Sequence, residues 1–242
     1  MDSCPQPRQR VIPLWLDLAA GLCVTLALAM AFASAVGLSG LPVVIGLALY
    51  GVIATLIALC WPAPADFGWA NRATLLRATL VAVLLGYVPW LNELGGWLWG
   101  YVLLALLALI LDGVDGKLAR ATGNNTAFGA RFDMELDALF ILGLSLAVVV
   151  LGKAGPWVLA LGLMRYLFVA ASWFMPWLNG DLPESFRRKT VCVWQVVTLM
   201  VALLPSISDN FAALTLATAL VLLGWSFLVD IHGLYQRRNR YE

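Results

Sequence analysis

Charged side chains are scarce in this chain: 12% of its 242 residues are Asp, Glu, Lys or Arg, whereas 62% are hydrophobic. Soluble globular proteins carry about 25% charged residues, so the composition excludes an ordinary soluble domain. The chain has one histidine and four cysteines, and no two cysteines stand at the CxxC spacing of a zinc or redox site. Its formal net charge is +1 and it has no long basic run, so nothing points to a nucleic-acid partner. Composition therefore indicates a protein that crosses the lipid bilayer several times.

Long apolar runs are what the chain has instead. A helix needs about 20 apolar residues to cross a bilayer, and eight runs of roughly that length follow one another. They predict an all-α polytopic membrane protein with about eight transmembrane helices. The runs cover residues 14–36, 41–61, 73–91, 95–112, 133–153, 156–178, 190–205 and 211–232.

Basic residues fall on alternate sides of these runs and predict the topology. Loops that face the cytoplasm are enriched in Lys and Arg. One set of loops and both termini hold nearly all such residues near the apolar runs, whereas the opposite set holds only Lys153. Both termini are therefore predicted to be cytoplasmic. The basic residues of the cytoplasmic set are Arg8, Arg10, Arg72, Lys117, Arg120, Arg131, Arg187, Arg188, Lys189, Arg237, Arg238 and Arg240.

Five of the fourteen acidic residues lie within 26 residues, beside two of the apolar runs. Carboxylates next to hydrocarbon are costly, so their grouping calls for a compensating partner. Helical spacing places Asp112 and Asp115 on one face, and Asp133 and Asp137 on another. The turn-prone segment ATGNNTAF between them predicts two helices joined by a cytoplasmic turn. Glu135 points away from the second face, and a solvated or capping role is expected for it.

Four converging aspartates predict a site for two divalent cations. Oxygen ligands suit Mg²⁺ or Mn²⁺ rather than zinc or copper, and Mg²⁺ commonly binds carboxylates together with substrate phosphates. The small residues Gly116, Ala119 and Gly129 leave room between the two helices. Arg120, one turn beyond the acids, could hold phosphate oxygens with its guanidinium. The pattern thus favours metals plus a phosphate-bearing substrate.

The same residues resemble the signature of the CDP-alcohol phosphotransferases, D-x2-D-G-x2-A-R-x8-G-x3-D-x3-D. Upstream, NRATLLR is similar to the N-x2-T-x2-R segment of that family, although Ala70 stands where a proline often precedes the asparagine. Downstream, RRKT at 187–190 resembles phosphatidylglycerophosphate synthase-like members. The signature is met at every position, by Asp112, Asp115, Gly116, Ala119, Arg120, Gly129, Asp133 and Asp137.

The resemblance implies a six-helix core over residues 68–242, preceded by residues 1–67 with two extra helices, and a possible homodimer. It implies a transferase of phospholipid biosynthesis that moves a substituted phosphate from a CDP-alcohol, with CDP-diacylglycerol the expected donor, to an alcohol acceptor, with release of CMP. Asp112, Asp115, Asp133 and Asp137 would bind metal, and Asp137 would also be the general base. The nucleotide or phosphate would contact Asn71, Thr74, Gly116, Ala119, Arg120 and Gly129. Their positive charge makes Arg77, Arg187, Arg188 and Lys189 candidates for binding an anionic acceptor, together with Arg165.

Some alternatives stay open at this point. Arg165 lies inside an apolar run, so it either pairs with one of the acids or contacts substrate. The aspartates could also be the ion site of a divalent-cation transporter, although they lie near the end of an apolar run rather than at its middle. An inactive family member is a third possibility, which the intact acids argue against.

Overall fold

Helices make up nearly all of the described chain. A computed structural model describes residues 13–61, 67–122, 126–180 and 185–241, with the side chains of residues 114–122, 179 and 238–241 left aside. Short 3-10 turns precede α4 and α6, and another follows α6; no strand occurs among these residues. The α-helices are α1 (Leu14–Val36), α2 (Leu41–Cys60), α3 (Gly68–Tyr87), α4 (Leu98–Thr122), α5 (Ala127–Val150), α6 (Leu159–Phe174), α7 (Phe186–Ala202) and α8 (Asp209–Tyr241).

Six of these helical segments are long and apolar enough to cross a membrane, among the described residues. They contain α1, α2, α3, α4, α6 and α8. The other two carry charge at their beginnings: α5 has Asp133, Glu135 and Asp137 in its first half, and α7, of 17 residues, starts with two arginines and a lysine. The prediction of an all-α polytopic membrane protein is confirmed. The charges of α5 include two of the aspartates of the predicted site.

The helix α3 is the centre of the fold. Within its apolar stretch 78% of the residues are buried inside the protein, against 22% to 28% in the other five candidate spans. It packs against α1, α2, α4 and α5. Its contact with α2 is so close that a Cβ on Gly86 would lie 2.6 Å from the backbone oxygen of Pro42. The hydroxyl of Tyr87 donates to the backbone oxygen of Ala29 in α1 at 2.7 Å. The two N-terminal helices are thus packed against the central helix.

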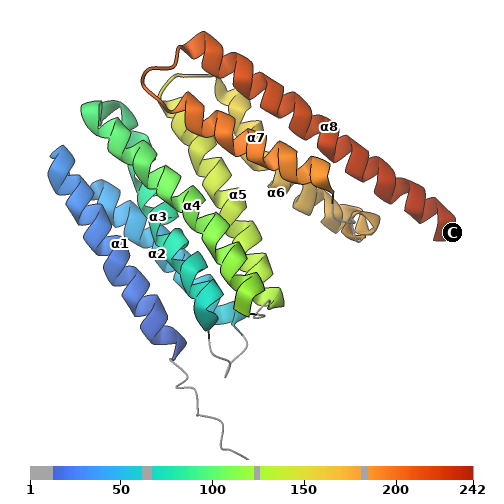
Figure 1. The fold of residues 1–242 in the computed structure, drawn as a ribbon, viewed down its shortest axis with the longest axis horizontal. Helices are drawn as coiled ribbons and strands as arrows, with labels where there is room; N and C mark the ends of the chain where they lie inside the picture. Colours follow the sequence, from blue (N-terminus) through green and yellow to red (C-terminus); the bar gives the residue numbers. More distant parts are fainter. Residues whose placement is uncertain (1–12, 62–66, 123–125, 181–184, 242) are drawn as a thin grey trace, which may run out of the picture.

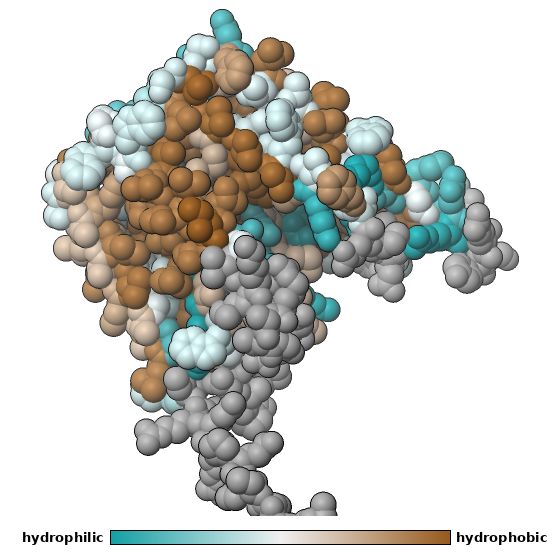
Figure 2. All heavy atoms as spheres, viewed as in Figure 1, coloured by the Kyte–Doolittle hydropathy of each residue, from teal (hydrophilic) through white to brown (hydrophobic). Residues whose placement is uncertain are grey.

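The helices form two groups, α1 to α5 and α6 to α8, which meet along α5 (Figure 1). The beginnings of α1, α3 and α5 and the end of α4 lie along the same edge of the bundle, the lower edge in Figure 1. These four helix ends, which border loops expected to be cytoplasmic, therefore lie on one side of the molecule. The surface in Figure 2 is broadly apolar, with a hydrophilic recess where the two groups meet.

Helix ends differ from the limits of the apolar runs. The helix α3 begins at Gly68 rather than near residue 73, and α4 continues to Thr122 rather than ending near residue 112. Hydropathy marks the length of chain that contacts lipid, whereas a helix continues through polar residues until its backbone finds a cap. At the beginning of α5, Thr126 is such a cap: its hydroxyl accepts a hydrogen bond from the Gly129 N–H at 3.0 Å. The expected turn between the two acidic helices falls at residues 123–125, outside the described residues, and both flanking helices are present.

Candidate active site

Three of the four predicted aspartates meet between α4 and α5. Asp112 lies in α4, and Asp133 and Asp137 lie one turn apart in α5. Each offers a carboxylate oxygen, and these oxygens all lie within 4.8 Å of one another. Their side chains are 36% to 40% exposed, so solvent or a substrate can reach them. The spacing argument correctly placed Asp133 and Asp137 on one helix face, opposite Asp112.

Arg77 of α3 lies against this cluster. Its Nη1 is 2.7 Å from Asp112 Oδ1 and 2.8 Å from Asp133 Oδ1, and its Nη2 contacts Asp137 Oδ1. The Arg77 side chain is only 1% exposed. One guanidinium therefore joins α3, α4 and α5 through all three carboxylates. Arg77 was expected near an acceptor, and the structure shows it in contact with the proposed metal ligands.

The beginning of α3 lies close to the beginning of α5. Asn71 is buried, and its side-chain N–H donates to the backbone oxygen of Phe67 at 2.7 Å. Its other side-chain atom, Oδ1, would lie 2.5 Å from a Cβ on Gly129. Thr74, one turn later and also buried, donates to the backbone oxygen of Ala70 at 3.1 Å. Asn71, Thr74 and Arg77 thus share the face of α3 that meets the acid-bearing helices. Asn71 occupies the space that a side chain at position 129 would need, so a glycine fits there.

The remaining signature residues lie near the end of α4. The backbone of Asp115, Gly116, Ala119 and Arg120 is helical and continues the helix that carries Asp112. Their side chains lie outside the described part of the structure, so their predicted roles stay predictions.

A family model for CDP-alcohol phosphatidyltransferases matches residues 67–229, which is more than half of the chain. The match begins just before α3 and includes all three clustered aspartates, Arg77 and Asn71. The chain belongs to the CDP-alcohol phosphatidyltransferase family. The resemblance that the signature indicated is therefore confirmed.

Curated relatives of this family member are cholinephosphotransferases. Cholinephosphotransferase 1 of Rattus norvegicus is 34% identical over 152 residues, and those of Mus musculus and Bos taurus are 33% and 31% identical over the same length. Each match covers 60% of this chain and 36% of the relative. The chain thus spans about a third of the length of these relatives. No solved structure gives a significant match.

Three of the other candidate cations, Arg165, Arg187 and Arg188, have carboxylate partners. Arg165 of α6 donates to Glu135 Oε1 at 2.6 Å, which is the pairing alternative of the two that its position left open. The Glu135 side chain is 58% exposed and also pairs with Arg165. Arg187 of α7 donates to Asp230 of α8 at 2.6 Å, and Arg188 lies 3.6 Å from the same oxygen. Lys189 follows in the first turn of α7 and also interacts with its surroundings.

The donor set fits a divalent cation. All three clustered ligands are carboxylates, which are the ligands that Mg²⁺ and Mn²⁺ prefer. Three negative charges and the single positive charge of Arg77 leave a net charge of −2, the amount that one divalent ion neutralises. Asp115, in the same helix as Asp112, would add a fourth carboxylate for a second ion.

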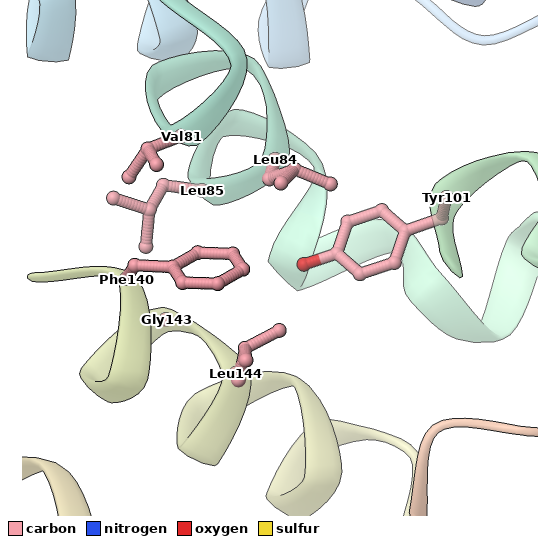
Figure 3. Close-up of a pocket in the computed structure, with 7 residues that line it drawn as sticks. All are labelled: Val81, Leu84, Leu85, Tyr101, Phe140, Gly143 and Leu144. Carbon is pink, nitrogen blue, oxygen red and sulfur yellow. The ribbon is translucent and has the colours of Figure 1, made fainter. Parts of the chain in front are cut away.

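A small cavity further along α5 does not belong to this site. It is lined by Val81, Leu84, Leu85, Tyr101, Phe140, Gly143 and Leu144, from α3, α4 and α5 (Figure 3). Figure 3 shows the Tyr101 hydroxyl pointing toward it among apolar side chains. No charged group lines it, so the cavity offers nothing that binds a metal or a phosphate.

Sequence reasoning missed several charged partners around the site. Asp230 was not linked to Arg187, nor Asp17 of α1 to Arg72 of α3, whose Nε lies 2.9 Å from Asp17 Oδ1. A signal was present in each case, because an ionisable residue inside an apolar run nearly always has a partner. Cys192 of α7, which the sequence did not link to the site, lies close enough to Asp137 and Asp112 for their negative charges to act on its thiol.

Proposed function

We propose that this protein is a metal-dependent transferase that moves a substituted phosphate from a CDP-alcohol to an alcohol acceptor and releases CMP, in phospholipid biosynthesis. One observation carries the proposal: the carboxylates of Asp112, Asp133 and Asp137 converge within 4.8 Å at three metal-binding positions of the family signature. Membership of the family supports the reaction class.

Asp137 acts as the general base in this proposal. The acceptor oxygen forms a bond to the phosphorus atom that is transferred, and the bond from that phosphorus to the CMP oxygen breaks. The hydroxyl proton passes to the Asp137 carboxylate, whose side chain is 40% exposed and so within reach of a substrate. Bound divalent ions supply positive charge to the phosphate oxygens. Asp112, Asp115 and Asp133 are the further ligands that hold these ions.

The nucleotide lies, in this proposal, where α3 meets the beginning of α5. Asn71 and Thr74 are buried polar side chains on that face of α3, and the absence of a side chain at Gly129 lets Asn71 pack directly against α5. Gly116 and Ala119 would let the nucleotide approach α4, and Arg120 would hold phosphate oxygens. The helix ends of this region share one edge of the bundle, which supports a site on the cytoplasmic side.

The donor and the acceptor are tested as a pair. CDP-diacylglycerol is the donor expected from the resemblance to phosphatidylglycerophosphate synthase-like members, and CDP-choline is the donor suggested by the name of the curated relatives. Two of the arginines expected to bind an anionic acceptor already have their charge neutralised by a carboxylate: Arg165 pairs with Glu135, and Arg187 pairs with Asp230. This favours an uncharged alcohol over a phosphorylated one.

The decisive experiment measures CMP release by the purified protein with Mg²⁺, each donor and a panel of alcohols, and identifies the lipid product. We expect Asp137→Asn to lower turnover by about a hundredfold to ten-thousandfold while the protein stays folded. Glu135→Gln is the matched control, because Glu135 lies on the same helix and pairs with Arg165 instead; its turnover should stay within a few-fold of wild type. Ion flux into liposomes with no CMP release from any donor would instead indicate the cation transporter.

A further inference from the structure

Arg77 has an unusual position for a residue of a substrate-binding site. Its side chain is 1% exposed, and its Nη1 alone lies within 2.8 Å of carboxylate oxygens from two different helices. Its Nη2 contacts the third carboxylate, that of Asp137. A buried guanidinium in contact with three acids has little freedom to reach a separate acceptor.

The same three carboxylates are the ligands of the divalent site. A carboxylate oxygen that accepts a hydrogen bond from a guanidinium is partly neutralised and offers less charge to a metal ion. Arg77 and a divalent ion therefore compete for Asp112, Asp133 and Asp137. Without either cation, three carboxylates within 4.8 Å of one another would repel each other and push α4 and α5 apart.

We propose that Arg77 is the resident counter-cation of the metal site. Before metal binds, its guanidinium holds the three carboxylates in place; when metal binds, Arg77 gives up part of these contacts. Arg77 is thus a positioning residue that stabilises the empty site and weakens metal binding. The role of the metal rests on the proposed function.

A second arginine on α3, Arg72, serves as a control for the loss of a positive charge from this helix. Arg72 lies five residues before Arg77, is 15% exposed, and pairs with Asp17 of α1 at 2.9 Å. Asp17 does not belong to the metal cluster. Loss of Arg72 removes a partly buried positive charge from α3 without changing the charge in contact with the three carboxylates.

Mn²⁺ binding to the metal-stripped full chain, followed by electron paramagnetic resonance, tests this role. We expect Arg77→Gln to bind Mn²⁺ at least about tenfold more tightly than wild type, because one positive charge leaves the cluster. The melting temperature of Arg77→Gln without metal should be lower than that of wild type. Saturating Mn²⁺ should raise the melting temperature of this variant by more than it raises that of wild type. Arg77→Lys keeps the positive charge beside the carboxylates and should bind Mn²⁺ within about threefold of wild type. Arg72→Gln should leave Mn²⁺ affinity unchanged.

Equal or weaker Mn²⁺ binding by folded Arg77→Gln would overturn the proposal. If that variant folds only with metal present, it is purified with Mn²⁺ and the rate of Mn²⁺ loss to a chelator is compared with wild type; faster loss than wild type also overturns it. A wild-type protein that neither binds Mn²⁺ nor releases CMP would contradict the proposed function itself. A wild type that binds Mn²⁺, with Arg77→Gln no tighter, contradicts only the role of Arg77.

Discussion

Replacement of Gly129 by alanine tests the contact between α3 and α5 at the site. A Cβ at this position would lie 2.5 Å from Asn71 Oδ1 and 3.0 Å from Thr126 Oγ1. Both distances are too short for a carbon and an oxygen in contact. Asn71 is buried and held by its hydrogen bond to the Phe67 carbonyl, so it has to move for the methyl group to fit.

The expected change in stability has three parts. Overpacking costs about 1–3 kcal/mol, and loss of the Asn71 hydrogen bond costs about 1 kcal/mol. Alanine is a better helix former than glycine by about 0.5–1 kcal/mol. Gly129→Ala should therefore lower the free energy of unfolding by about 1–3 kcal/mol. Turnover should fall more than tenfold, because the displaced Asn71 belongs to the proposed nucleotide site.

Thermal unfolding in detergent and CMP release measure the two effects. Gly51→Ala is the matched control: Gly51 lies within α2, a Cβ there meets nothing within 4 Å, and stability should rise by up to about 1 kcal/mol. Adding Asn71→Ala to Gly129→Ala removes the clash, so the double variant should be at least as stable as Asn71→Ala alone. If Gly129→Ala is stabilised like Gly51→Ala and keeps normal turnover, the close approach of α3 and α5 is refuted.

Three further outcomes follow from the site and its surroundings. Chelation of divalent ions should lower CMP release at least about a hundredfold, and added Mg²⁺ should restore it. Asp230→Asn should lower the free energy of unfolding by about 3 kcal/mol, because Arg187, which is 19% exposed, loses its charged partner. Maleimide labelling of Cys192 should slow when CMP and Mg²⁺ are bound, because Cys192 lies near Asp137 and Asp112.

Each of these outcomes has its own control. Full turnover after exhaustive chelation would contradict a metal-dependent reaction. Adding Arg187→Gln to Asp230→Asn removes the unpaired charge and should recover part of the lost stability; no recovery would mean that the pair does not couple α7 to α8. Cys23 of α1 should label at the same rate with and without CMP. If Cys192 behaves like Cys23, α7 does not face the occupied site.

The apolar runs predicted the helices well because each run reports a length of chain in lipid. They could not predict where helices end, since a polar segment such as the end of α4 remains helical beyond the apolar run. They also gave no sign that α3 is central, because burial by other helices and exposure to lipid both require apolar side chains. Only the packed structure distinguishes the two.

For the site, the spacing of residues within one helix predicted which of them share a face. The sequence did not predict which residues of different helices pair with each other. Asp133 and Asp137 could be placed on one face because they are four residues apart in a helix. Arg77 is 56 residues from Asp133, and Arg187 is 43 residues from Asp230. A charge in an apolar run predicts that a partner exists, whereas the identity of the partner depends on how the helices pack.

The central position of α3 has a consequence for how the protein enters the membrane during synthesis. An arginine in the middle of a helix opposes insertion by about 2.5–3.5 kcal/mol, and Arg77 lies near the middle of α3. The helices that α3 packs against most closely on one side, α1 and α2, are synthesised before it, but the acids that neutralise Arg77 are on α4 and α5 and emerge later. The earlier pair can receive α3 as soon as it leaves the ribosome, through the contact at Gly86. Asp112 of α4 can compensate the charge of Arg77 first, and the full cluster of three carboxylates forms only when α5 has also been inserted. Assembly of the proposed site therefore coincides with completion of membrane insertion of the first five helices.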